Sequence, residues 1–144
     1  MPKSNLNKLK SSFPPVADKE INILILGSLP GEKSLEMQQY YAHPQNRFWK
    51  VIAQINNCNL PINYEEKLSL LRGNKIGVWD VVHSAKRIGS LDVNILDESP
   101  NDLESFIENH PNLKTIAFNG SKSQKLYDKY FKRNPNIKYL GLPS

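Results

Sequence analysis

The sequence has little cysteine and no long apolar segment: Cys58 is its single cysteine, and apolar residues make up 39% of the chain. A lone cysteine excludes an internal disulfide and a cysteine-based metal cluster, and it favours a reducing compartment. The polar start, Met1 to Ser4, lacks the apolar region of a signal peptide. We therefore expect a soluble protein without a membrane span or a membrane partner.

Internal repeats and low-complexity segments are also missing. A length of 144 residues allows one domain, residues 1–144, which can bury a substantial core without staples. The net charge of +5 and the pI of about 9.3 admit an anionic partner such as nucleic acid. This indication is weak by itself, because many soluble proteins are basic without such a partner.

What the chain does contain is a series of short apolar segments separated by helical patterns. The expected strands are Asn22–Leu26, Ile76–Val82, Lys114–Phe118 and Lys138–Leu142. The expected helices are Glu32–Gln39, Pro44 to about Asn56, Asn63–Arg72, Asn101–Asn109 and Gly120 to about Phe131, with a helical turn over Leu6–Ser11 and a long loop over Ser84–Pro100. The alternation predicts an α/β sandwich with a mostly parallel sheet.

The loop after the first strand, with the sequence GSLPG at residues 27–31, is the first place to expect a site. Ligands of open α/β sheets bind outside the carboxyl ends of the strands. In a parallel sheet the same edge also receives Asp80, the segment Asn119–Ser121 and the end of the chain. The topology therefore predicts a pocket among these residues.

Six segments of the sequence form a specific combination. They are GSLPGEKSL (27–35), QYYAHPQNRFW (39–49), GVWDVV (77–82), RIGSLD (87–92), IAFNGSKS (116–123) and GLPS (141–144). Together, over Pro14 to Ser144, they resemble the hypoxanthine-DNA glycosylase family, a branch of the uracil-DNA glycosylase superfamily. The resemblance implies a three-layer α/β/α sandwich with a four-stranded central sheet. Family members continue past LPS, so it also implies that this chain is truncated at its C-terminus, before a second catalytic motif.

The resemblance further implies an activity. A monofunctional DNA glycosylase without a cofactor would flip a deaminated base, chiefly hypoxanthine, out of double-stranded DNA and hydrolyse its N-glycosidic bond. A monomer in the cytoplasm of a bacterium or archaeon, associated with the nucleoid, is expected. Two alternatives stay open: a catalytically silent DNA-binding relic, and a nucleotide-binding module. The nucleotide-binding module is the less favoured of the two, because GSLPG lacks the GxGxxG spacing of a dinucleotide-binding loop.

Residue roles follow from the resemblance. Much of the superfamily positions the attacking water with Asp or Asn at the place of Leu29, which has no suitable group, so the catalytic part passes to Asn46. The implied base pocket comprises Gly27, Ser28, Leu29, Tyr41, His43 and Asp80, where the Asp80 carboxylate would accept a hydrogen bond from N1–H of hypoxanthine. DNA phosphates would contact Lys86, Arg87, Gly120, Ser121 and Lys122. No metal site is expected, because the three histidines have no ligand spacing.

Each of these residues also has a structural interpretation. Asn46 is suited to a helix start, and His43 to capping or packing. Tyr41 would belong to the core with Tyr40, as Phe48 and Trp49 would, and Asp80 would cap a nearby turn. Asn119 or Ser121 would provide ordinary helix capping, and the basic residues would be solvated surface charges. The residues alone do not decide between these roles.

Overall fold

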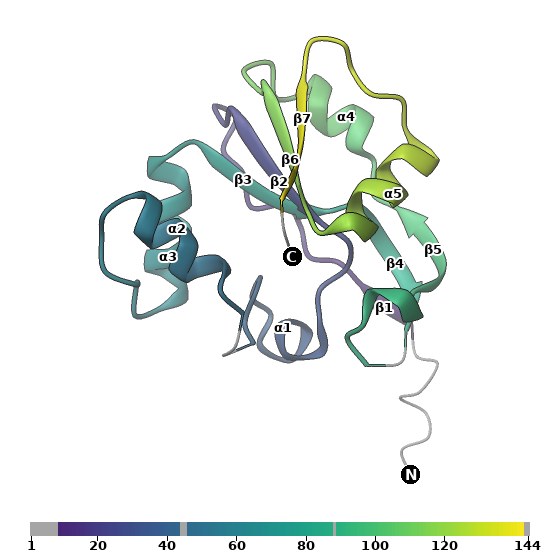
Figure 1. The fold of residues 1–144 in the computed structure, drawn as a ribbon, viewed down its shortest axis with the longest axis horizontal. Coiled ribbons are helices and arrows are strands. Elements are labelled where there is room, and N and C mark those ends of the chain that lie inside the picture. The colour runs from purple at the N-terminus through teal and green to yellow at the C-terminus, as the bar shows by residue number, and fades with distance from the viewer. Residues whose placement is uncertain (1–8, 44–45, 88, 143–144) are drawn as a thin grey trace.

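A four-stranded parallel sheet forms the centre of the molecule. The computed structural model describes residues 9–43, 46–87 and 89–142 (Figure 1). The strands lie in the order β3 (Ile76–Asp80), β2 (Ile23–Gly27), β6 (Thr115–Asn119) and β7 (Lys138–Leu142). The register places Gly27 beside Asp80 and Asn119 beside Leu142. All four expected strands are confirmed, and their carboxyl ends share one edge.

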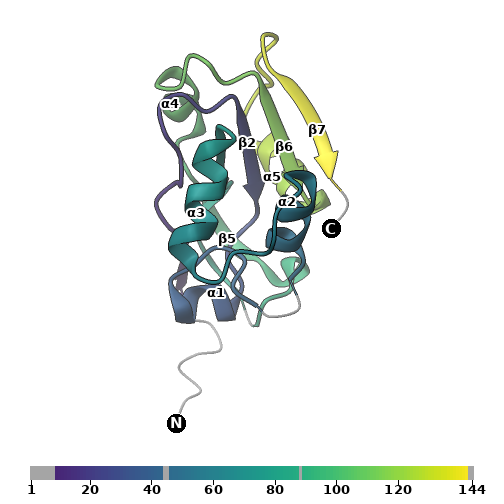
Figure 2. The same ribbon diagram turned by 90° about the vertical axis from the view of Figure 1, so that its left-hand side faces the viewer.

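Helices cover both faces of this sheet (Figures 1 and 2). The helices α2 (Phe48–Ile55) and α3 (Tyr64–Gly73) lie on one side, and α4 (Leu103–Glu108) and α5 (Ser121–Tyr130) on the other, while α1 (Glu32–Met37) lies near the carboxyl edge. One core cluster includes Leu24, Leu26, Ile116, Phe118, Leu103 and Leu126, and the other includes Ile25, Val78, Ala117, Trp49, Ile52 and Leu71. The three-layer α/β/α architecture is therefore confirmed. None of the helices described is long and apolar enough to cross a membrane.

Local sequence signals explain where two of the helices begin. The Asn63 Oδ1 atom accepts a hydrogen bond from the Glu66 N–H at 2.9 Å, so the expected N-cap of α3 is confirmed. Helix α2 begins at Phe48, later than predicted, because the Asn46 Oδ1 atom accepts the Phe48 N–H at 2.9 Å and ends the preceding segment. The proposed start at Pro44 lies outside the described residues. Asn46 thus precedes α2 and is not part of its first turn.

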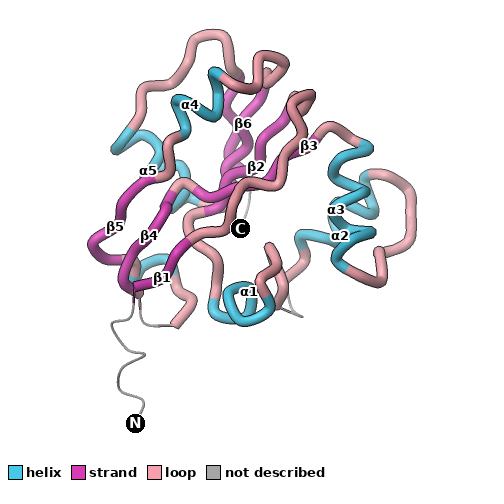
Figure 3. The backbone as a smooth tube through the Cα atoms, turned by 180° about the vertical axis from the view of Figure 1, so that it is seen from behind, coloured by secondary structure: helices cyan, strands magenta, loops and turns pink. Residues whose placement is uncertain are grey.

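A second, antiparallel sheet was not predicted (Figure 3). It has the order β1 (Leu9–Ser11), β4 (Val82–Lys86) and β5 (Leu96–Pro100). Strands therefore replace the helical turn expected over Leu6–Ser11, as far as those residues are described, and much of the loop expected over Ser84–Pro100. The sequence LDESP of β5 contains acidic residues and a proline, which are poor strand formers. Its register with β4 also shifts twice, so the sequence of β5 does not show the regular alternation that indicates a strand.

One continuous extended segment joins the two sheets. Strand β3 passes through Val81 into β4, and both Val81 and Val82 are fully buried. The Val81 N–H donates to the Gly27 carbonyl at 2.8 Å, and the Val82 N–H donates to the Ser28 carbonyl at 3.0 Å. The site loop is therefore fixed along its backbone to the junction between the sheets.

Candidate functional site

A pocket of about 1020 Å³ opens at the carboxyl edge of the parallel sheet. Its lining includes all seven residues proposed for base binding and catalysis, namely Gly27, Ser28, Leu29, Tyr41, His43, Asn46 and Asp80. It continues over the sheet between α2 and β7, where Val51, Ile55, Leu140 and Leu142 remain partly exposed. Ile55, the last residue of α2, is 71% exposed.

Asp80 lies at the end of β3 with its carboxyl group buried in the pocket floor. Its Oδ2 atom accepts a hydrogen bond from the Ser12 hydroxyl at 3.1 Å. A Cβ atom placed on Gly27 would lie 2.7 Å from the Asp80 Oδ1 atom, so only glycine leaves room for this carboxylate. Burial raises the pKa of Asp80 to about 7, against the opposing effects of the Ser12 hydrogen bond and the Arg87 charge. The Asp80 side chain therefore bonds to the N-terminal segment and changes protonation near neutral pH.

Tyr41 has features of both a core residue and a site residue. Its ring stacks on Phe48, with 4.1 Å between centroids, and it packs against the core cluster of α2 and α3. Its φ of 53° is in the left-handed region, which is uncommon for a non-glycine residue and often found at functional sites. Its hydroxyl is buried without a hydrogen-bond partner among the described residues. Burial and then the charge of Asp80 raise the pKa of Tyr41, whereas the nearby Asn119 side chain lowers it. Its contact with a base stays a prediction.

His43 and Asn46 form the wall of the pocket that leads into α2. The Asn46 N–H donates to the His43 carbonyl at 2.9 Å. The Asn46 side-chain oxygen accepts the Phe48 N–H with one of its two lone pairs, and its NH₂ group remains able to donate. Trp49 is buried, and Phe48 is half-buried on the pocket wall, as expected for these two residues. Asn46 therefore accepts a hydrogen bond at the start of α2 and also lines the pocket.

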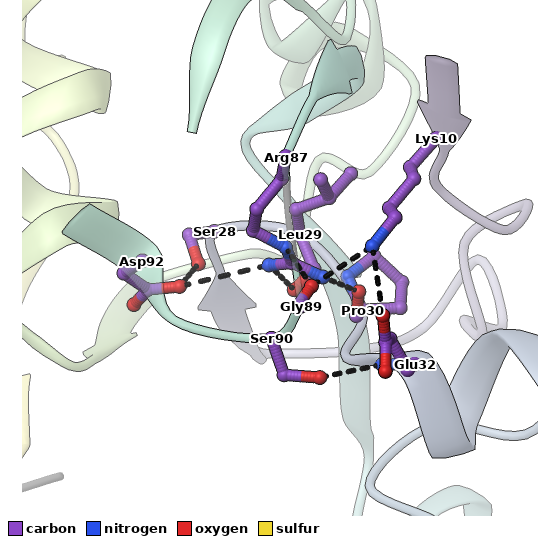
Figure 4. Close-up of polar contacts among 9 residues, drawn as sticks. All are labelled: Lys10, Ser28, Leu29, Pro30, Glu32, Arg87, Gly89, Ser90 and Asp92. Carbon is purple, nitrogen blue, oxygen red and sulfur yellow. Dashed lines mark hydrogen bonds and ion pairs between the residues drawn. The ribbon is translucent and has the colours of Figure 1, made fainter. Parts of the chain in front are cut away.

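Arg87 does not have the role that the sequence suggested. Its side chain is fully buried, at 1% exposure. The Nε atom donates to the Gly89 carbonyl at 3.0 Å, and the guanidinium also donates to the carbonyls of Leu29, at 3.4 Å, and Pro30 (Figure 4). A guanidinium enclosed by backbone carbonyls is not available to a DNA phosphate, so this prediction is wrong. Arg87 instead holds the GSLPG loop in place.

Asp92 is a site residue that the sequence analysis missed. The Ser28 hydroxyl donates to the Asp92 Oδ1 atom at 2.6 Å, and the Arg87 guanidinium lies 4.0 Å from that atom. Asp92 also lines the pocket, and its side chain is 42% exposed. The only sequence signal was its place in the RIGSLD segment. The structure thus brings Asp92 to the pocket in addition to Asp80 and to Glu32, whose carboxylate pairs with Lys10.

Further bonds join the RIGSLD segment to the start of α1 (Figure 4). The Lys10 ammonium donates to the Gly89 carbonyl at 2.9 Å and lies 3.5 Å from the Glu32 carboxylate. The Ser90 hydroxyl accepts a hydrogen bond from the Glu32 N–H at 2.8 Å. The RIGSLD segment and the start of α1 are therefore held together by charged and neutral contacts.

The remaining phosphate candidates lie nearer to solvent. Lys86 is exposed on β4 and lies 3.9 Å from the Asp97 carboxylate. Gly120, with a φ of 98°, precedes Ser121 and Lys122 in the first turn of α5. No side chain caps this turn, so the alternative of capping by Asn119 or Ser121 is wrong. Since α5 follows the carboxyl end of β6, its start lies on the pocket edge, and phosphate contact by these residues stays a prediction.

The described residues contain no group of three or more His, Cys, Asp or Glu side chains placed to hold a metal ion.

A family model described as the uracil DNA glycosylase superfamily matches residues 14–143. The chain belongs to the uracil DNA glycosylase superfamily. This membership confirms the resemblance and disfavours a nucleotide-binding module.

Members of the superfamily in one archaeal genus are similar to this chain over most of its length. A hypoxanthine DNA glycosylase of Methanosarcina barkeri is 48% identical over 115 residues, which are 79% of this chain and 73% of the relative. A hypoxanthine DNA glycosylase of Methanosarcina acetivorans is 45% identical over 116 residues, 80% of this chain and 73% of the relative. A solution NMR structure of a candidate uracil DNA glycosylase from Methanosarcina acetivorans has a TM-score of 0.84 at 40% identity, covering 95% of this chain and 84% of the other.

Proposed function

We propose that this chain is a monofunctional DNA glycosylase that hydrolyses the N-glycosidic bond of deaminated bases, chiefly hypoxanthine, flipped out of duplex DNA. The observation that carries the proposal is the buried Asp80 carboxylate on the floor of a pocket at the carboxyl edge of the sheet. The relatives named hypoxanthine DNA glycosylase support the same activity. We also propose that the protein acts as a monomer in the cytoplasm, near the nucleoid.

Asp80 would select the base through its Watson–Crick edge. Hypoxanthine carries a donor at N1, which a carboxylate accepts well, whereas adenine has an acceptor at N1 that an ionised Asp80 would repel. Gly27 allows the base to approach the carboxylate, because any larger residue would crowd its Oδ1 atom. Extruding the base costs a few kcal/mol, and this cost is smaller for a mispaired base such as hypoxanthine.

The chemistry requires stabilisation of charge at two places. Breaking the bond between C1′ and the purine builds positive charge on the sugar and negative charge on the leaving base. The NH₂ group of Asn46 would hold the water or donate to the purine. The Lys33 side chain on the pocket rim is 41% exposed and lies 3.7 Å from Glu36, so it is not the desolvated amine that Schiff-base chemistry needs. An abasic site in an intact strand is the expected product.

A cleavage assay tests the proposed function directly. Duplexes carrying one hypoxanthine, uracil or xanthine are incubated with the protein, and the abasic site is then revealed by alkali. We expect strand breaks only after alkali and fastest with hypoxanthine. Breaks without alkali would contradict monofunctional chemistry, and no release of any base would favour the DNA-binding relic.

Phosphate binding by Lys86 and Lys122 gives a prediction on salt dependence. Each phosphate contact releases counterions, so removing one should lessen the log–log slope of affinity against salt by roughly one unit. We expect this change in both Lys86→Ala and Lys122→Ala, measured by fluorescence anisotropy with an abasic-analogue duplex. Arg72→Ala, at the opposite edge of the sheet, is the control and should keep the slope. An unchanged slope in Lys122→Ala would place that residue on the solvated surface.

A further inference from the structure

The site described so far has no strong group to bind the attacking water. Leu29 is buried and apolar at the position where much of the superfamily has Asp or Asn. The Asn46 carbonyl oxygen already accepts the Phe48 N–H, and a neutral amide is a poor base. Asp80, with a pKa of about 7, lies on the floor where the base would bind. A carboxylate for the water must therefore come from elsewhere in the pocket.

Asp92 has the position and the support that such a group needs. Its Oδ1 atom is fixed by the Ser28 hydroxyl at 2.6 Å and faces the buried Arg87 guanidinium at 4.0 Å. The Oδ2 atom has no hydrogen-bond partner among the described residues, and the side chain lines the pocket while remaining 42% exposed. One oxygen is anchored by Ser28 and Arg87, and the other points away from both side chains in Figure 4.

Asp92 also lies near the other ionisable groups of the pocket. Its charge contributes to the raised pKa values of both Asp80 and Tyr41, so it lies close to the pocket floor. Its partner Arg87 also donates to the carbonyls of Leu29 and Pro30. The carboxylate is thus tied to the loop that carries Leu29, where the polar side chain is missing.

We propose that Asp92 is a catalytic residue that binds the attacking water and takes its proton, and that Ser28 and Arg87 position it. This rests on the proposed glycosylase function. A bond forms between the water oxygen and C1′ while the bond from C1′ to the base breaks, and its electron pair leaves with the base. The water proton passes to Asp92 and then to solvent, and the base takes a proton from solvent. The anionic carboxylate also stabilises the positive charge that develops on the sugar.

Single-turnover cleavage of Asp92→Ala tests the proposal. We expect a rate about a hundredfold lower than the parent's, within the range of general-base catalysis, with unchanged affinity for an abasic-analogue duplex. Added formate should restore part of the rate in Asp92→Ala but not in Asn46→Ala, because a small carboxylate can occupy the space that Asp92 leaves. The matched control is Asp128→Asn, an exposed carboxylate paired with Arg133 at 2.9 Å, which should keep the parent rate.

Loss of Asp92 leaves a buried guanidinium without its carboxylate, so thermal melting must accompany the kinetics. If Asp92→Ala does not fold, Ser28→Ala decides: it keeps both charges, and a rate about tenfold below the parent's is expected. A parent rate in folded Asp92→Ala, a slow rate without formate rescue, or a parent rate in Ser28→Ala each overturns the proposal. All variants are assayed on whichever base the parent releases. A parent that spares hypoxanthine but cleaves uracil would therefore refute the proposed base preference and still test Asp92.

Discussion

Replacement of Asn46 by alanine is expected to lower the single-turnover rate of hypoxanthine excision by a hundredfold or more, about 2.7 kcal/mol of barrier. The reason is the loss of the Asn46 NH₂ group, which lies on the pocket wall and remains able to donate to water or to the purine. The same change removes the bond to the Phe48 N–H, which resembles a helix cap and should cost about 1 kcal/mol of stability. Binding to an abasic-analogue duplex should survive, because it depends on phosphates and flipping.

The control for this variant is Asn74→Ala. Asn74 also makes a side-chain bond at a helix end, its Nδ2 atom donating to the Leu70 carbonyl at 2.8 Å, but it lies at the opposite edge of the sheet. Both variants should lose similar stability, and only Asn46→Ala should lose activity. If Asn46→Ala cleaves at near the parent rate, or simply unfolds, the structural interpretation of Asn46 holds. Asp80 and Asp92 would then be the remaining catalytic candidates.

Replacement of Asp80 by asparagine is expected to stabilise the protein above pH 7. The folded-state pKa of Asp80 is raised by burial to about 7, so the folded protein binds a proton more tightly than the unfolded chain does. The free energy of unfolding therefore falls as pH rises from about 4 to 7 and stays low above that. The neutral amide of Asp80→Asn avoids this cost, which is on the order of 4 kcal/mol. Chemical denaturation at pH 5 and pH 8 measures it, and the difference between parent and variant should appear mainly at pH 8.

The same titration should appear in the kinetics. If the ionised Asp80 accepts N1–H of hypoxanthine, the excision rate of the parent should rise about tenfold between pH 6 and pH 8, as the carboxylate population grows. In Asp80→Asn this step should vanish, while Asp128→Asn should retain it. A variant with the pH profile and the stability of the parent would show that Asp80 neither ionises in this range nor contacts the base.

The parts of the structure that the sequence predicts are those that depend on local patterns. Apolar segments such as Ile23–Gly27 indicate buried strands, and parallel pairing then brings Gly27 and Asp80 together at one edge. The cap formed by Asn63 is similarly local. These features do not depend on knowing how distant segments pack.

The errors that matter most for the site concern contacts between distant segments. A basic residue in a presumed loop is expected at the surface, yet Arg87 bonds to carbonyls 57 and 58 residues away in the chain. Ser28 and Asp92 are 64 residues apart, and no spacing rule connects them. Both arrangements require β4 and β5, whose register shifts and acidic residues hide them. The contacts that hold the site in place could therefore not be predicted from the sequence. Most of the residues on the pocket floor could be predicted.

The strand that runs from β3 through Val81 into β4 also determines which parts of the pocket are rigid. Val81 and Val82 are fully buried, and their N–H groups bond to Gly27 and Ser28. Their amide hydrogens should exchange with solvent only through global unfolding, because no local opening frees them without breaking the junction of both sheets. The floor with Asp80 is thus among the most slowly exchanging backbone of the fold, whereas the wall with His43 and Asn46 lies outside the sheets. Evolution of new base preferences should then proceed through the wall, where a substitution does not disturb the backbone that both sheets share.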